Sequence, residues 1–145
     1  MLRISPVLMV LIGLGLFVGC DSNTAATCED AGPLGGLWTY SSIESSASSP
    51  QRKGTFEIEA DACPDLRGTF DVVEMDASGT RVRDTGPVYG VKRPDGARLN
   101  LVSGTSRIEH SGVLTGDTLH GDWITVRDGE VFASGTFEAT RRLNP

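Results

Sequence analysis

The two histidines, His110 and His120, are the side chains of this sequence best suited to proton transfer or to binding a metal ion. Residues 116–117 are Gly-Asp, which is typical of a tight turn, and the hairpin around it places the two histidines on opposite faces. That arrangement argues against a metal ion shared between them. His120 and Asp122 share one face, as alternate residues of a strand do, and a lone pair of this kind usually makes a surface contact.

Serines cluster between residues 41 and 49, where they form either a solvated connection or a loop over one end of the domain. No G-x-S-x-G turn accompanies them, so they are not expected to act as nucleophiles. Carboxylates alternate with apolar residues and favour solubility, as at Glu57, Glu59, Asp71 and Glu138. The glycines fall between predicted strands, which argues against a phosphate-binding loop. We therefore expect no enzymatic activity, no cofactor and no metal site.

The chain has 145 residues, which is room for one domain. Its 13 Lys and Arg residues are outnumbered by 19 Asp and Glu residues, and the net charge of −6 argues against a nucleic-acid partner. Hydrophobic residues make up 39% of the chain, which argues against both an integral membrane bundle and a wholly disordered protein.

The N-terminus has the pattern of a secretory signal. Arg3 precedes an apolar run over residues 7–18, and this run is too short to cross a bilayer as a helix. Phe-Val-Gly-Cys at residues 17–20 resembles the lipobox of bacterial lipoproteins, with Phe17 where Leu is usual. An ordinary signal peptide with a chance cysteine and an uncleaved membrane helix are the alternatives.

The resemblance to bacterial lipoproteins implies that the signal peptide, residues 1–19, is removed and that Cys20 receives acyl chains, palmitate among them. Several acyl chains hold a protein durably in a bilayer, whereas one holds it only marginally. The protein is then expected in the bacterial cell envelope, anchored to the lipid bilayer and facing the periplasm. Asp21 matches the pattern that retains lipoproteins at the inner membrane in enteric bacteria. Residues 20–34 are polar and small, which is typical of a tether.

Cys28 and Cys63 remain once Cys20 is acylated, and an even pair of cysteines in an exported chain predicts a disulfide bond. Cys28 lies in the tether, and Cys63 lies in a turn-like stretch between two predicted strands. The bond would hold the tether against one end of the domain and contribute about 3 kcal/mol in the chain-entropy model.

Period-two alternation of apolar and polar residues dominates from residue 35 to residue 145. Gly-Thr-Phe occurs at residues 54, 68 and 135, where we interpret it as the start of a strand. The predicted strands cover residues 36–43, 54–60, 68–72, 80–84, 87–93, 97–103, 106–115, 119–127 and 130–142. Short connections between them predict an all-β fold: a single antiparallel up-and-down meander of eight or nine strands that closes into a small barrel.

Asp-Gly at residues 128–129 is a strong signal for a two-residue hairpin turn. Counted strictly from this turn, Trp123 and Phe137 fall on opposite faces of the sheet, although both are apolar and bulky. A β-bulge at Gly121 or Gly135 would bring them to the same face.

Gly-Leu-Trp at residues 36–38, followed by a meander that ends in Gly-x-Phe-x-Ala-x-Arg, resembles the lipocalin-like (calycin) barrels. The resemblance implies that Trp38 packs at the closed end of a barrel, with Arg141 or Arg142 laid across its ring in a cation–π contact. The residues expected to face the interior, as core or against a ligand, are Phe56, Ile58, Phe70, Val72, Leu99, Leu101, Ile108, Trp123 and Phe137.

Two functions fit a lipid-anchored barrel of this size. The first is a non-enzymatic binder of a small apolar or amphipathic ligand, and the second is a cell-envelope module with a filled interior that contacts another protein. An apolar pocket of about 300 Å³ or more would favour the first function, whereas an interior plugged by aromatic side chains would favour the second.

Overall fold

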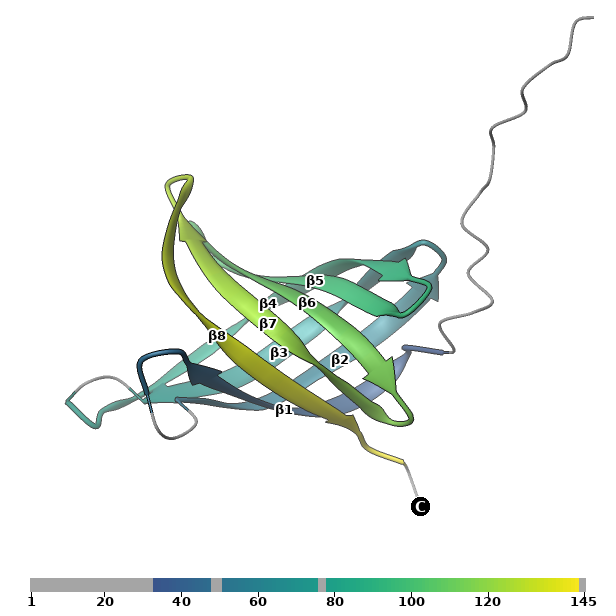
Figure 1. Cartoon of the computed structure of the whole chain (residues 1–145), viewed down its shortest axis with the longest axis horizontal. Coiled ribbons are helices and arrows are strands. Elements are labelled where there is room, and N and C mark those ends of the chain that lie inside the picture. The colour runs from purple at the N-terminus through teal and green to yellow at the C-terminus, as the bar shows by residue number, and fades with distance from the viewer. Residues whose placement is uncertain (1–32, 48–50, 76–77, 144–145) are drawn as a thin grey trace, which may run out of the picture.

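The computed structural model describes residues 33–47, 51–75 and 78–143. These residues form eight antiparallel strands in sequence order around a closed barrel (Figure 1). The strands are β1 (Gly36–Glu44), β2 (Arg52–Ala62), β3 (Asp65–Met75), β4 (Arg81–Arg93), β5 (Gly96–Ser103), β6 (Ser106–Thr115), β7 (Thr118–Arg127) and β8 (Glu130–Arg141). The predicted all-β up-and-down barrel is confirmed.

The first and last strands close the barrel. β1 pairs with β8 from Trp38 opposite Arg141 to Glu44 opposite Gly135, and it pairs with β2 on its other side. Closure gives every strand a neighbour on both sides, although residues 81–87 of β4 pair with β3 alone. The β1–β2, β3–β4, β5–β6 and β7–β8 connections meet at one end of the barrel, which we call the mouth. The other end, where the described chain enters and leaves, is the closed end; it lies to the right in Figure 1.

Eight strands form where up to nine were predicted, because residues 80–84 and 87–93 belong to one continuous strand, β4. Gly86 and Pro87 interrupt the apolar alternation but pair with Phe70 and Thr69 of β3. Pairing between β4 and β5 begins only at Val88, so the missing N–H of Pro87 costs no hydrogen bond on that side.

The three Gly-Thr-Phe segments lie inside strands, so their interpretation as strand starts is wrong. A Cβ on Gly54, Gly68 or Gly135 would lie 2.1, 1.8 or 1.9 Å from a carbonyl oxygen of the neighbouring strand. No other residue fits where the backbones approach this closely. The phenylalanine two residues after each glycine is buried inside the barrel.

The β-bulge expected in the last hairpin is present, but its predicted position is wrong. Thr125 pairs with Ala133 and Val126 pairs with Val131, so Phe132 is the extra residue, and neither Gly121 nor Gly135 is bulged. The shift turns both Trp123 and Phe137 inward, where they are 2% and 5% exposed. The predicted Asp-Gly turn is confirmed, with φ angles of 52° and 84°.

Side chains fill most of the interior. All nine residues predicted to face the interior are buried. Ile108 is 7% exposed, and the other eight are 1% to 5% exposed. Aromatic rings run through the centre: Trp38 stacks on Phe56 at 5.8 Å between centroids, and Tyr40 meets Phe56 at 6.3 Å and Phe137 at 6.2 Å. The core therefore extends from the closed end past the middle of the barrel.

Candidate functional site

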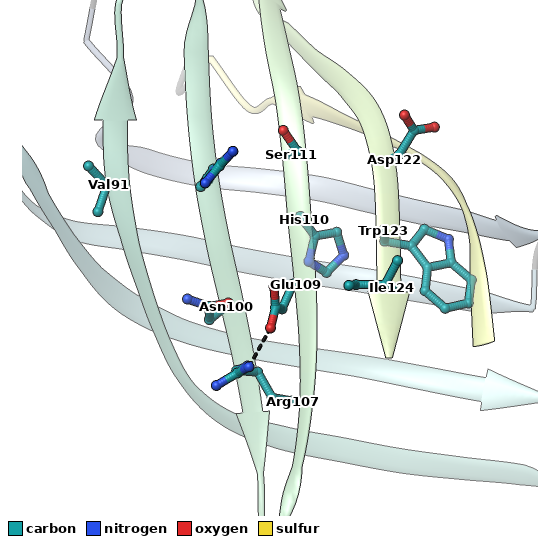
Figure 2. Close-up of a pocket in the computed structure, with 10 residues that line it drawn as sticks. Val91, Asn100, Arg107, Glu109, His110, Ser111, Asp122, Trp123 and Ile124 are labelled. Carbon is teal, nitrogen blue, oxygen red and sulfur yellow. Dashed lines mark hydrogen bonds and ion pairs between the residues drawn. The ribbon is translucent and has the colours of Figure 1, made fainter. Parts of the chain in front are cut away.

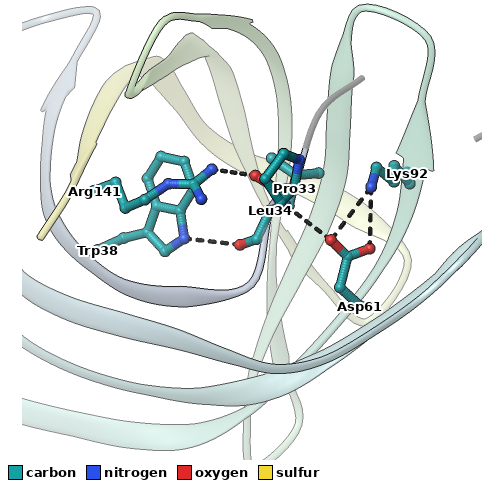
Figure 3. Close-up of polar contacts among 6 residues, drawn as sticks. All are labelled: Pro33, Leu34, Trp38, Asp61, Lys92 and Arg141. Carbon is teal, nitrogen blue, oxygen red and sulfur yellow. Dashed lines mark hydrogen bonds and ion pairs between the residues drawn. The ribbon is translucent and has the colours of Figure 1, made fainter. Parts of the chain in front are cut away.

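The closed end is sealed around Trp38, which is completely buried. The indole N–H of Trp38 donates to the carbonyl oxygen of Leu34 at 3.0 Å, and the guanidinium of Arg141 lies 4.8 Å from the ring centroid (Figure 3). Arg141 also donates to the carbonyl oxygen of Pro33. The side chain across Trp38 is thus Arg141, whereas Arg142 donates to the hydroxyl of Thr39 on the exposed surface.

Leu34 was assigned to the tether, but its side chain is 2% exposed and packs in the core. Asp61 accepts a hydrogen bond from the backbone N–H of Leu34 at 2.8 Å and lies 3.2 Å from the ammonium of Lys92. Burial raises the pKa of the Asp61 carboxyl, but the hydrogen bonds from Leu34 and Lys92 outweigh burial and lower the pKa overall. The space among Leu34, Trp38 and their apolar neighbours has no room for a water molecule, so no ligand enters from this end.

Tyr40 and His110 form a hydrogen bond of 2.9 Å between the phenol oxygen and Nε2 in the middle of the barrel. Burial lowers the pKa of His110 to about 3 and raises the pKa of Tyr40 to about 12, so both are neutral at physiological pH. His110 is 3% exposed, whereas His120 and Asp122 lie on the outer face, as the predicted hairpin requires. Alternation indicates the face that His110 occupies, but not its bond to Tyr40, which is 70 residues away.

The mouth contains a cavity of about 260 Å³. Arg52 lies at its inner wall, 8% exposed, where its Nε and Nη2 donate to the two carboxylate oxygens of Glu74 at 3.1 and 3.2 Å. The Arg52 guanidinium also lies 4.5 Å from the ring centroid of Trp123. The remaining lining residues are Glu44, Asp84, Leu101, Ser103, Ser106, Ile108, Thr125, Arg127, Phe132 and Ala133.

One buried hydroxyl group on the cavity wall, Thr125 Oγ1, has no hydrogen-bond partner among the described residues. Thr125 is 6% exposed. Leaving such a group unpaired costs about 1–3 kcal/mol. A bound molecule that hydrogen bonds to Thr125 would recover part of that cost.

A second hollow, of about 570 Å³, lies on the outside of β5, β6 and β7 (Figure 2). Its outward-facing side chains are exposed or half-buried, and Arg98 and Arg107 balance Glu109 and Asp122 in charge. Arg107 is already paired with Glu109. This hollow has no net charge to select a ligand. The mouth is the candidate site because the buried hydroxyl of Thr125, which has no partner among the described residues, lies on its wall.

Among the residues that the structure describes, no three His, Cys, Asp or Glu side chains are grouped so that they could hold a metal ion. No helix in the described ranges has the length and apolar character needed to span a membrane.

The predicted signal peptide and lipidation site, with Arg3, Phe17, Cys20 and Asp21, lie outside the described residues, as does Cys28. Cys63 lies on the turn between β2 and β3, at the closed end where the described chain begins. The pairing of Cys28 with Cys63 stays a prediction. The hydroxyl of Thr125 and the guanidinium of Arg52 were not singled out from the sequence, because no local pattern marks a polar residue that turns inward.

Comparison with known proteins assigns this barrel to no family. No protein-family model matches the chain, and no curated protein matches it.

Proposed function

We propose that this protein is a lipid-anchored, non-enzymatic barrel of the bacterial cell envelope that holds a small amphipathic ligand in its mouth. The observation that carries the proposal is the buried, unpartnered hydroxyl of Thr125 on the wall of an otherwise open cavity. Ligand sites combine an apolar wall with a few polar groups that orient the ligand. Here Leu101, Ile108 and Ala133 supply the apolar wall.

The ligand is small and amphipathic rather than a long apolar chain. A lipid tail would need the space that Tyr40, Phe56 and Phe137 already occupy below the mouth. The free volume of about 260 Å³ lies below the roughly 300 Å³ that would favour a ligand, and aromatic side chains plug the interior, so cavity volume alone favours the filled-barrel alternative. The ligand proposal depends instead on the Thr125 hydroxyl, which has no partner among the described residues, and on the charged side chains that border the cavity.

The lipid anchor belongs at the opposite end from this cavity. The described chain begins at Pro33, beside Arg141 at the closed end, and the proposed tether with acylated Cys20 precedes it. The proposed anchor is therefore joined to the barrel at its closed end rather than at its mouth, and Asp21 favours the inner membrane.

Native mass spectrometry of the full-length protein tests the ligand proposal. We expect an adduct of small-molecule mass that is lost in Ala133→Trp, because the new indole fills the cavity from its half-buried wall position. Ser134→Trp is the matched control, since residue 134 faces outward on the same strand and should keep the adduct. An adduct that survives Ala133→Trp, or none in either protein, contradicts the proposal.

The second candidate function is a filled barrel that contacts another envelope protein. It is favoured by the plugged interior and by the β7–β8 hairpin, where Val131 and Phe132 are 63% and 71% exposed. The absence of any adduct in the experiment above supports this alternative.

A further inference from the structure

Carboxylates outnumber cations around the mouth. Glu44, Glu74 and Asp84 line the cavity, together with two guanidinium groups, those of Arg52 and Arg127. Arg52 pairs with Glu74, whereas Glu44 and Asp84 form no ion pair with any described residue. The uncompensated charge on the cavity wall is therefore negative.

Arg52 is poorly placed to bind an anionic ligand. Its side chain is 10% exposed, two of its nitrogens are bound to Glu74, and its guanidinium also lies against Trp123. An incoming carboxylate would have to displace Glu74 from a bidentate pair and would then face the remaining carboxylates. Both steps oppose binding, because charge-assisted bidentate pairs are among the stronger polar contacts in proteins.

Arg127 reduces the excess to one negative charge but does not reverse it. Its guanidinium lies 4.9 Å from the ring of Phe132, at the exposed outer edge of the mouth. The wall below it is formed by Thr125, whose hydroxyl oxygen accepts hydrogen bonds and has no partner within the described ranges.

We infer that the ligand held in the mouth is a small organic cation, a primary amine with a short apolar tail. An ammonium group has three donors, and the Thr125 hydroxyl and the carboxylates of Glu44 and Asp84 are acceptors on the wall of this cavity. The tail packs on Leu101, Ile108 and Ala133. The inference rests on the proposed function, since it names the ligand class for the same cavity.

Three probes of equal chain length test the inference: hexylamine, hexanoate and 1-hexanol, each titrated calorimetrically into the full-length protein in one non-ionic detergent. We expect hexylamine to bind about tenfold more tightly than either other probe, with an affinity that falls as salt is added. Tryptophan fluorescence separates binding at the closed end from binding elsewhere, because Trp38 is buried at the closed end while Trp123 lies beside Arg52 and also borders the outer hollow. The Asp84 and Asp122 variants then separate the mouth from that hollow.

Asp84→Asn should weaken hexylamine binding about three- to fivefold, as expected for a partly solvated ion pair. Asp122→Asn is the control, since it removes the same charge from the outer face of β7. Thr125→Val should also weaken binding while leaving the fold at least as stable, because it removes a buried hydroxyl without a partner. A purely structural hydroxyl would not change affinity.

The outcomes separate the two proposals. Hexanoate or hexanol binding as tightly as hexylamine overturns the cationic ligand and leaves a ligand-binding barrel. If Asp84→Asn and Asp122→Asn weaken hexylamine binding equally, the amine is attracted to surface charge in general. That result also overturns the cationic ligand in the mouth. No binding by any probe, with an adduct still present in native mass spectra, overturns the amine alone. No binding and no adduct overturn both.

Discussion

At the scale of single residues, the polar groups inside the barrel distinguish this protein from a barrel with a purely apolar core. Tyr40 and His110 share one hydrogen bond, and Phe137 packs edge-on against the imidazole at 4.8 Å between centroids. Burial of the imidazole away from water disfavours its charged form.

Stability should therefore decrease in acid because of His110. Burial lowers the pKa of His110 to about 3, whereas histidine in an unfolded chain titrates at 6.5. Between these values only the unfolded chain binds the proton, so the free energy of unfolding falls as the pH decreases, by about 1 kcal/mol per pH unit. His110→Gln removes this titration, and urea unfolding at pH 7, 5.5 and 4.5 should show a flatter dependence on pH.

His120→Gln is the control for the pH experiment, because His120 is exposed on the outer face of β7. It should keep the slope of the natural protein. An unchanged slope in His110→Gln would contradict the role assigned to the buried imidazole.

At the scale of the strands, glycines set the curvature. Gly54, Gly68 and Gly135 lie inside strands where the backbone of the neighbour leaves no space for a Cβ. Each is followed two residues later by an inward phenylalanine, so close approach of backbones and a large interior side chain alternate along the strand. The recurring Gly-Thr-Phe thus combines a glycine that lets neighbouring backbones approach closely with a phenylalanine that fills the barrel interior.

Gly135→Ala should destabilise the barrel by about 3 kcal/mol, because the added Cβ would lie 1.9 Å from the carbonyl oxygen of Ile43 and force the β1–β8 closure apart. Gly35→Ala is the matched control: its nearest atoms are 3.8 and 3.9 Å away, which is ordinary contact, and its stability should be nearly unchanged. Urea unfolding at neutral pH measures both, and equal effects would show that β1 and β8 do not approach this closely.

At the scale of the whole molecule, the two ends of the barrel differ. Trp38, Arg141 and Leu34 seal the closed end with hydrogen bonds and apolar contacts, whereas the mouth combines charges with free volume. The proposed anchor precedes the closed end along the chain, so attachment to a bilayer and access to the mouth do not compete.

Cys20→Ala should move the protein from the membrane fraction to the soluble fraction, because the acyl chains proposed on Cys20 supply the membrane affinity. Fractionation with detection by immunoblot measures the change, and Ser22→Ala, two residues further on, should leave the protein in the membranes. Retention of Cys20→Ala in membranes would show that the anchor is not an acylated Cys20.

The sequence by itself determined the strand class, the approximate strand number and the inward residues of the earlier strands, because alternation along a strand is a local property of the backbone. It also determined the tight turn at residues 128–129, since glycine and aspartate tolerate positive φ there. Only the tertiary structure decided that Phe132 is the bulged residue, because alternation defines faces relative to a register that the neighbouring strand sets. The Tyr40–His110 bond, the burial of Leu34 and the position of Arg52 beside Trp123 likewise required closure of the barrel, which brings together residues with no local pattern in common.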